Sequence, residues 1–390
     1  MRPLYLTATT AVTALGRGSA AQGDALLARR SGLRPNDFDP AAGGWIGRVD
    51  GLEDRALRPE WTRFDCRNNR LADLALHTDG FAERVAEAKA RYGPHRIAVI
   101  LGTSTSGILS GEDAYRDRDG EGALPSGFDY SGTQDLYSVG HYVRAVLGLQ
   151  GPSFVISTAC ASSARAFMDA ARLIRAGLCD AAVVGGADTL CRMTLHGFRA
   201  LELISPEACR PCDADRAGIS IGEAAGFALL EREGAGLALL GAGASSDGHH
   251  MSSPHPEGAG AVAAMRQALE AAGLRPEEID WINLHGTGTR ANDATEDLAV
   301  ATVFGDAVPC SSTKGWTGHT LGACGIIEAV LAAQCMQRSF VAGCLGVTRP
   351  DPGFRAQVAT ETLERPVRHV LSNSFGFGGA NCSLVFGRVH

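Results

Sequence analysis

One order of elements occurs in both halves of this 390-residue chain and restricts its fold: a short apolar strand, a Gly/Thr loop, a second strand and an Ala-rich helix. In the first half, a strand over residues 96–101 ends in the loop 102–107, and the segment 154–159 leads into a helix that ends near residue 176. A strand over residues 180–186 then completes a β-α-β unit. Chains that alternate strands and helices in this way form layered α/β folds.

The same order returns in the second half, which predicts an internal duplication with little sequence identity. Its strands and helix are expected over residues 279–284, 308–313, 326–337, 369–373 and 382–386. We expect halves of residues 1–235 and 236–390 that pack as one body, because no Pro- or Ser-rich linker separates them. Residues 110–135, rich in Gly, Asp and Arg, form the most irregular insertion.

Composition excludes several classes of protein. A hydrophobic content of 45% and a charged content of 20% are typical of a compact enzyme. The net charge of −7 argues against nucleic-acid binding. No run of eighteen apolar residues predicts a membrane span, and the N-terminus does not resemble a signal peptide. Eleven cysteines without regular spacing indicate reduced thiols and a cytoplasmic location.

Cys160 lies at the turn between a strand and a helix, and it is the first candidate for chemistry. A helix N-terminus favours a thiolate over a thiol, and such a turn presents a nucleophile to a substrate. Most free cysteines are instead buried structural residues. One thiol without a base leaves both interpretations open.

Two of the eleven histidines, His285 and His319, lie in Gly/Thr loops that follow strands, where α/β folds place their active sites. A third Gly-rich loop, over residues 373–381, could supply a backbone amide to an oxyanion hole. Each loop alone is consistent with a plain turn. Together with Cys160 they indicate an active site.

Metal binding is the rival use of these residues, and we expect no metal. Neither histidine belongs to a His-x-x-x-His pair or lies near a Cys-x-x-Cys pair. Cys209 and Cys212 form one Cys-x-x-Cys without a second pair, and His249, His250 and His255 do not have the spacing of a helical ligand pair.

Four linked motifs together resemble the β-ketoacyl-acyl-carrier-protein synthases of the type I/II group, within the thiolase superfamily. They are the cysteine turn at residues 157–164, His-Gly-Thr-Gly-Thr at 285–289, Lys-x-x-x-Gly-His-x-Leu-Gly-Ala at 314–323 and Asn-Ser-Phe-Gly-Phe-Gly-Gly-x-Asn at 373–381. The resemblance covers essentially the whole chain. It implies a five-layer αβαβα fold made of two similar halves, a homodimer or close heterodimer, and decarboxylative Claisen condensation.

The resemblance also implies roles for individual residues. The Cys160 thiolate would attack an acyl thioester, and the N–H groups of Cys160 and Phe377 would hold the tetrahedral oxyanion. His285 and His319 would bind the thioester carbonyl of malonyl-carrier protein and stabilise the enolate formed on loss of CO₂. Two histidines point to an elongating synthase, since degradative and initiating relatives replace the second.

The same resemblance implies that Lys314 and Glu328 form a pair behind the second histidine, with Lys314 tuning His319. It also implies that Thr287 and Thr289 bind the phosphopantetheine arm. No bound cofactor is implied beyond the phosphopantetheine-linked acyl and malonyl groups of acyl carrier protein. Carrier docking on this acidic chain would use Arg63, Arg67 and Arg70, which match a basic helix of relatives; a solvated face is the alternative.

Departures from the family pattern concern the acyl pocket, assigned to Thr105, Phe198 and Phe377. Thr105 lies where fatty-acid synthases carry a bulky aliphatic gate, and the chain is shorter than typical type II synthases. This combination resembles the compact synthases of aryl polyene pathways, which act beside a chain-length-factor partner. Two alternatives stay open: the chain is itself a non-catalytic chain-length factor, or it is a thiolase or acyltransferase.

Overall fold

The first half of the molecule contributes five main strands to a mixed sheet, and the two-residue strand β2 (Gly16–Arg17) adds to one of them. In the computed structural model, which describes residues 2–389, these strands are β1 (Leu4–Thr13), β5 (Ile97–Gly102), β6 (Ser153–Ile156), β7 (Ala181–Asp188) and β9 (Ala224–Glu231). Their order is β1-β9-β7-β5-β6. The neighbours β7, β5 and β6 run parallel, whereas β9 is antiparallel to both β1 and β7.

The second half repeats this arrangement strand for strand. Its strands are β10 (Gly236–Ser246), β11 (Trp281–Asn283), β12 (Pro309–Ser311), β16 (His369–Gly376) and β17 (Ala380–Val389). Their order is β10-β17-β16-β11-β12, with the same parallel and antiparallel neighbours. The predicted duplication is therefore confirmed. Leu4 and Tyr5 of β1 pair with β10, so both halves share one hydrogen-bonded sheet.

Alternation along the buried strand β5 shows why the chain forms layers. Ala98 and Ile100 face the central core, which contains α6 (Ser162–Arg175) and α11 (Cys324–Arg338). The other side chains of the strand face a second core. That core is covered by three helices: α2 (Arg67–Leu76), α3 (Phe81–Tyr92) and α5 (Ser138–Val146).

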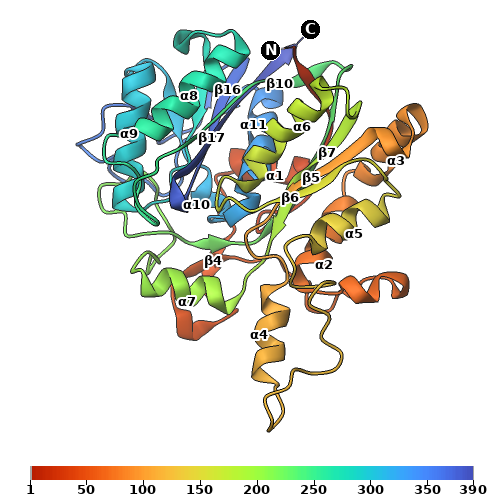
Figure 1. Cartoon of the computed structure of the whole chain (residues 1–390). Coiled ribbons are helices and arrows are strands. Elements are labelled where there is room, and N and C mark those ends of the chain that lie inside the picture. Colours follow the sequence, from red (N-terminus) through yellow and green to blue (C-terminus); the bar gives the residue numbers. More distant parts are fainter. Residues whose placement is uncertain (1, 390) are drawn as a thin grey trace.

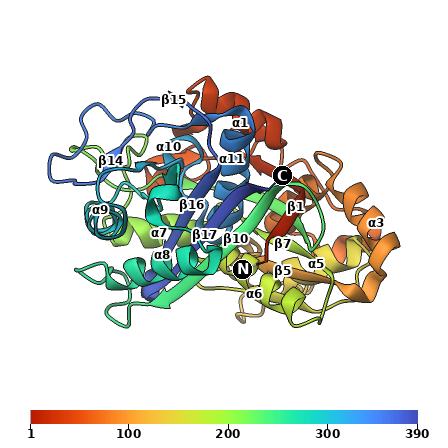
Figure 2. The same cartoon turned by 90° about the horizontal axis from the view of Figure 1, so that it is seen from above.

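The outer face of the second half is covered by α8 (Ala259–Ala272) and α9 (Arg290–Phe304), which pack on Ile282, Leu371 and Val385. Figures 1 and 2 both place α3 and α5 on one side of the molecule and α8 and α9 on the other. The layers therefore run helix, sheet, helix, sheet, helix, as expected of the thiolase-like fold.

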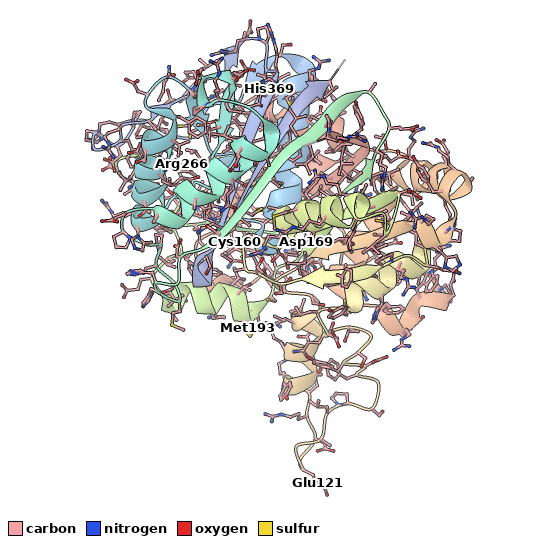
Figure 3. The ribbon with its side chains drawn as sticks, turned by 45° about the horizontal axis from the view of Figure 1, so that its top comes forward. Glu121, Cys160, Asp169, Met193, Arg266 and His369 are labelled. Carbon is pink, nitrogen blue, oxygen red and sulfur yellow. The ribbon has the colours of Figure 1, made fainter. Side chains whose placement is uncertain are left out.

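The irregular insertion projects from the body (Figure 1). It begins with α4 (Ile108–Arg116), and no helix or strand follows until Ser138. Glu121 lies at its far end (Figure 3). The remaining elements are short: α1 (Ser19–Leu27), α7 (Arg192–Ala200), α10 (Lys314–Thr317), β2 (Gly16–Arg17), β3 (Leu33–Pro35), β4 (Trp45–Gly47), β8 (Ile221–Gly222), β13 (Phe340–Val341), β14 (Gln357–Val358) and β15 (Leu363–Glu364).

Two further findings bear on the sequence-based expectations. The basic segment around Arg63 is split, because a 3-10 helix over Pro59–Phe64 ends before α2 begins at Arg67. Within residues 2–389, none of the helices combines the length and the apolar character needed to cross a membrane.

Candidate active site

Cys160 lies on a strained turn between β6 and α6. The preceding residue, Ala159, has a φ of 49°, a left-handed conformation that costs a non-glycine residue about 1 kcal/mol. The Ser162 hydroxyl accepts a hydrogen bond from Thr158 N at 2.9 Å and fixes the turn. Gly376 approaches so closely that a Cβ atom there would lie 3.1 Å from Cys160 N. The turn therefore holds the cysteine against the third Gly-rich loop.

The structure brings the three predicted catalytic side chains together, and all three are buried, with Cys160 near the middle of the molecule (Figure 3). His319 Nε2 lies 2.9 Å from Cys160 Sγ. The rings of His285 and His319 are 5.2 Å apart and nearly perpendicular, at 83°. His285 directly follows the β11 strand region, and His319 follows α10, so loops of the second half carry both histidines to the cysteine of the first.

Lys314 directly contacts the first histidine, which corrects the expectation that it lies behind the second. Its Nζ atom lies 2.5 Å from Glu328 Oε1, 2.5 Å from the backbone oxygen of His285 and 3.4 Å from His285 Nδ1. An ammonium group only donates, so Nδ1 is the acceptor. The proton of neutral His285 therefore lies on Nε2, the atom available to a substrate oxygen.

Both histidines are held neutral. Burial and the positive charge of Lys314 lower the pKa of His285 well below 6.5, and His319 lowers it further. Burial and Lys314 likewise lower the pKa of His319. Lys314 thus acts on His319 through its charge, without a direct hydrogen bond. Neutral imidazoles suit hydrogen-bond donation to a developing oxyanion.

The Cys160 thiol is not a preformed thiolate, contrary to the expectation from its place at a helix start. Burial raises its pKa to about 12. The charge of Lys314 and hydrogen bonds from the N–H groups of Phe377 and Cys160 act in the opposite direction, but desolvation prevails. Both N–H groups thus lie close to the sulfur, and their role as an oxyanion hole for the acyl carbonyl oxygen remains a prediction.

The donor atoms of Cys160, His285 and His319 lie within 4.8 Å of one another, so their spacing alone would suit a metal ion. The Lys314 ammonium opposes that use, because it repels a cation and keeps the proton of His285 on Nε2. This is the one such cluster in residues 2–389, so the Cys209–Cys212 pair belongs to none. The expectation of no metal remains a prediction.

Two buried carboxylates support the site and were missed by the sequence reasoning. Glu296 accepts hydrogen bonds from the N–H groups of His285 and Gly286, both at 2.7 Å, and fixes the histidine loop. Asp188, the last residue of β7, accepts hydrogen bonds from Ser104 N, Thr105 N and Ala323 N, and so joins two loops beside the turn. Asp293, Glu296 and Asp297 recur at helical spacing among small residues, which was the available signal.

A cavity of about 480 Å³ leads from the three side chains to the surface. Thr287 and Thr289 line its wall with hydroxyl groups 3.0 Å apart, and Phe198 and Phe377 line it with rings 5.6 Å apart. Thr105 does not line this cavity, contrary to its assignment to the acyl pocket. Its buried hydroxyl donates to Asp188 Oδ1 at 2.7 Å, so the side chain is held in the loop packing.

The three arginines of the expected docking segment have different environments. Arg67 is 8% exposed and donates two hydrogen bonds to the buried Glu223, at 2.9 and 2.7 Å, so it is not a surface residue as expected. Arg70 is partly buried and paired with Asp65 at 2.6 Å. Arg63 is exposed.

Comparisons with known proteins agree with this geometry. Family models match at residues 68–235 (Beta-ketoacyl synthase, N-terminal domain) and 237–348 (Beta-ketoacyl synthase, C-terminal domain). The chain is 32% identical to 3-oxoacyl-[acyl-carrier-protein] synthase 2 of Rhizobium meliloti strain 1021, over 100% of this chain and 99% of that protein. It is 40% identical to the mitochondrial 3-oxoacyl-[acyl-carrier-protein] synthase of Arabidopsis thaliana, over 64% of this chain and 59% of that protein.

Among solved structures, the ketosynthase ApeO of Xenorhabdus doucetiae, in complex with its chain length factor ApeC, superposes with a TM-score of 0.91. Its sequence identity is 41%, and the match covers 100% of this chain and 98% of that one. Similarity of sequence and of fold thus extends over the whole chain. The chain belongs to the β-ketoacyl synthase family.

Proposed function

We propose that this enzyme elongates a carrier-bound acyl chain by decarboxylative condensation with malonyl-acyl-carrier protein. The observation that supports this most directly is the buried Cys160–His285–His319 cluster at the inner end of the cavity, with Lys314 behind His285. A non-catalytic chain-length factor would lack the nucleophile. A thiolase would replace the second histidine, so both alternatives are disfavoured.

In the first step, Cys160 Sγ attacks the carbonyl carbon of an acyl thioester. The new S–C bond forms as the carrier's C–S bond breaks, and the Cys160 proton passes through His319 Nε2 to the departing phosphopantetheine thiolate. Within the described residues His319 Nδ1 has no hydrogen-bond partner, so its tautomer is not fixed. Nε2 can therefore accept a proton in this step, and it donates in the next once the ring has lost its Nδ1 proton and gained one at Nε2 by exchange with solvent in the cavity.

In the second step, the bond between the malonyl carboxylate and its methylene carbon breaks and CO₂ leaves. The electron pair moves onto the thioester oxygen, where the Nε2–H groups of His285 and His319 stabilise the enolate. The enolate carbon attacks the acyl-Cys160 carbonyl, and the N–H groups of Cys160 and Phe377 hold the oxyanion. Collapse expels the Cys160 thiolate, which takes one proton from solvent, and the 3-ketoacyl chain remains on the carrier.

Intact-mass measurement after incubation with an acyl-carrier protein tests the first step. We expect an acyl adduct on the wild type and none on Cys160→Ala. Cys160→Gln tests the second step separately, since it keeps both histidines and should still release CO₂ from malonyl-carrier protein. Loss of that release would contradict the role of the two histidines.

We infer that the working enzyme is a dimer, with itself or with a chain-length-factor subunit. Strand β6 forms a free edge of the sheet within residues 2–389, and its Phe154 is exposed. Such an edge is suited to pairing with another chain. The similar ketosynthase ApeO was solved with a chain length factor. The eleven cysteines are all free, which supports a reducing, cytoplasmic compartment.

The narrower proposal is an aryl or polyenoyl acyl chain. The Phe198 and Phe377 rings, tilted by 46°, form an aromatic wall beside Cys160 that suits a flat conjugated chain. Transfer rates onto Cys160 from saturated medium-chain and polyenoyl carriers test this proposal. Equal rates would overturn the narrower assignment and leave the condensing activity intact.

A further inference from the structure

We propose that the guanidinium group of Arg290 binds the phosphate of the phosphopantetheine arm at the mouth of the cavity. This inference rests on the proposed function and adds a residue to it. Arg290 is exposed and also lines the cavity that contains Cys160. Its side chain is therefore accessible both to solvent and to a substrate in the channel.

The position of Arg290 along the channel wall suits contact with the phosphate. His285, Thr287, Thr289 and Arg290 line the same cavity in chain order, from the buried catalytic centre to the surface. The six residues from His285 to Arg290 are joined by five steps and span at most about 17 Å. A phosphopantetheine arm whose thioester lies between the histidines extends over a comparable length. Its phosphate would then reach the level of Arg290, while its amide groups pass the two threonines.

Arg216, another cation that lines the cavity, holds this part of the wall in place. Arg216 is almost fully buried and pairs with Asp351 at 2.6 Å and with Asp293 at 3.5 Å. It also donates to the backbone oxygens of Thr289 and Arg290. Because its charge is already neutralised, Arg216 serves as an anchor that fixes the backbone from which Arg290 projects.

The guanidinium group of Arg290 has no direct polar partner that would compete with a phosphate. Within residues 2–389 its side chain makes no ion pair and no hydrogen bond, and its charge interacts at longer range with Asp351, which is already paired with Arg216. At the start of α9, Asn292 N donates to Thr289 Oγ1 and Asp293 N donates to the backbone oxygen of Thr289, so these two amides are engaged and the Arg290 side chain offers the full positive charge for an anion. Arginine presents a planar set of donors that matches phosphate oxygens.

The acidic side chains that line the cavity do not neutralise Arg290. Asp247 is engaged by Asn381 Nδ2 at 2.7 Å and by His255 N at 3.0 Å. Glu202 is exposed and repels a phosphate. An anionic ligand entering this mouth is therefore drawn to the Arg290 side.

The test compares two small substrates, malonyl-phosphopantetheine and malonyl-pantetheine, which lacks the phosphate. CO₂ release is measured with the wild type and with Arg290→Ala. For the phosphorylated substrate we expect Arg290→Ala to raise KM on the order of tenfold with kcat unchanged, because the contact is equal in ground and transition states. For malonyl-pantetheine we expect the same KM in both proteins.

Three further variants complete the test. Arg84→Ala removes the same charge from an exposed site on α3, on the opposite side of the molecule from α9, and should leave both KM values unchanged (Figure 2). Arg290→Lys keeps the charge without the planar fork and should recover part of the loss. Glu202→Gln should lower KM for the phosphorylated substrate only.

The outcomes are distinct. An equal rise of KM for both small substrates would overturn the phosphate contact in favour of a structural role. A loss seen only with intact malonyl-carrier protein would place Arg290 against the carrier's acidic surface and would also overturn it. If the wild type releases no CO₂ from any malonyl substrate, the proposed function itself fails, which is a separate result.

Discussion

His319 Nε2 lies 2.9 Å from Cys160 Sγ, although the two residues are 159 positions apart and belong to different halves of the chain. This contact joins a thiol of raised pKa to an imidazole of lowered pKa. Both groups are therefore neutral at rest. The proposed mechanism therefore activates the thiol during the attack, when its proton passes to His319, rather than beforehand at the helix N-terminus.

The pH dependence of alkylation should report this neutral thiol. With a pKa of about 12, the thiolate fraction of Cys160 rises about tenfold for each pH unit throughout the neutral range. We expect the rate of iodoacetamide modification at Cys160, followed by peptide mass, to rise without levelling off between pH 7 and 9. Cys160→Ala gives the background from the other thiols. A plateau below pH 9 would contradict the raised pKa.

Replacement of Lys314 should shift the acid limb of decarboxylation. Since the lysine charge helps to lower the pKa of His285, removing it raises that pKa towards 6.5. In a Cys160→Gln background, CO₂ release should stay level from pH 8 to 6. The added Lys314→Met change should make it fall as the pH drops through that range, because protonated His285 cannot be the neutral donor. Identical profiles would refute the coupling.

The buried Lys314–Glu328 pair should show strong coupling in stability. Lys314→Met or Glu328→Leu alone leaves one buried group without its partner, which typically costs about 3–5 kcal/mol. The double variant removes both charges and should lose clearly less than the sum of the two single variants. Urea unfolding of the four proteins measures this cycle. Additive losses would mean that the two side chains do not stabilise one another.

Glu296 should make stability fall as the pH rises. Burial raises its pKa from 4.5 to about 7, so its favourable contribution is present below pH 4.5 and is lost as the pH rises through 7. This difference corresponds to about 3 kcal/mol. Urea unfolding at pH 5 and pH 8 should show a smaller decline for Glu296→Gln than for the wild type. Parallel declines would exclude Glu296 as the titrating group.

Substitutions of Arg67 and Arg63 should distinguish a role in stability from a role in carrier docking. Arg67→Ala leaves Glu223 buried without its partner and should cost about 3 kcal/mol of unfolding free energy. Arg63→Ala should change the unfolding free energy by less than about 0.5 kcal/mol, because the side chain is exposed. Thermal melts measure both. If Arg63 contacts the carrier protein, KM for malonyl-carrier protein rises in Arg63→Ala alone.

The fold and the central chemistry could be predicted from sequence because their signals are local. The β5 strand and the turn at Cys160 are visible as an apolar run and a change of periodicity. His285 and His319 stand in short glycine-rich loops, and the order of the motifs gives the family. These features depend on a few neighbouring residues, so no tertiary contact is needed to recognise them.

The errors concern properties that depend on burial and on distant partners. Arg67 lies in a basic segment, yet its partner Glu223 is 156 residues away and takes it into the core. Thr105 looks like a pocket residue until Asp188, 83 residues away, engages its hydroxyl. The thiol pKa depends on desolvation by the whole surrounding core. The sequence around Arg67, Thr105 or Cys160 does not indicate any of these distant contacts.

The duplicated sheet divides the active site between two chemically different halves. Strands β6 and β12 occupy equivalent places in the two strand orders. Cys160 lies between β6 and α6, and His319 lies between β12 and α11, after the short helix α10. The corresponding connection of the repeated unit thus carries a thiol in one half and an imidazole in the other, so neither half alone contains the pair that lines the cavity.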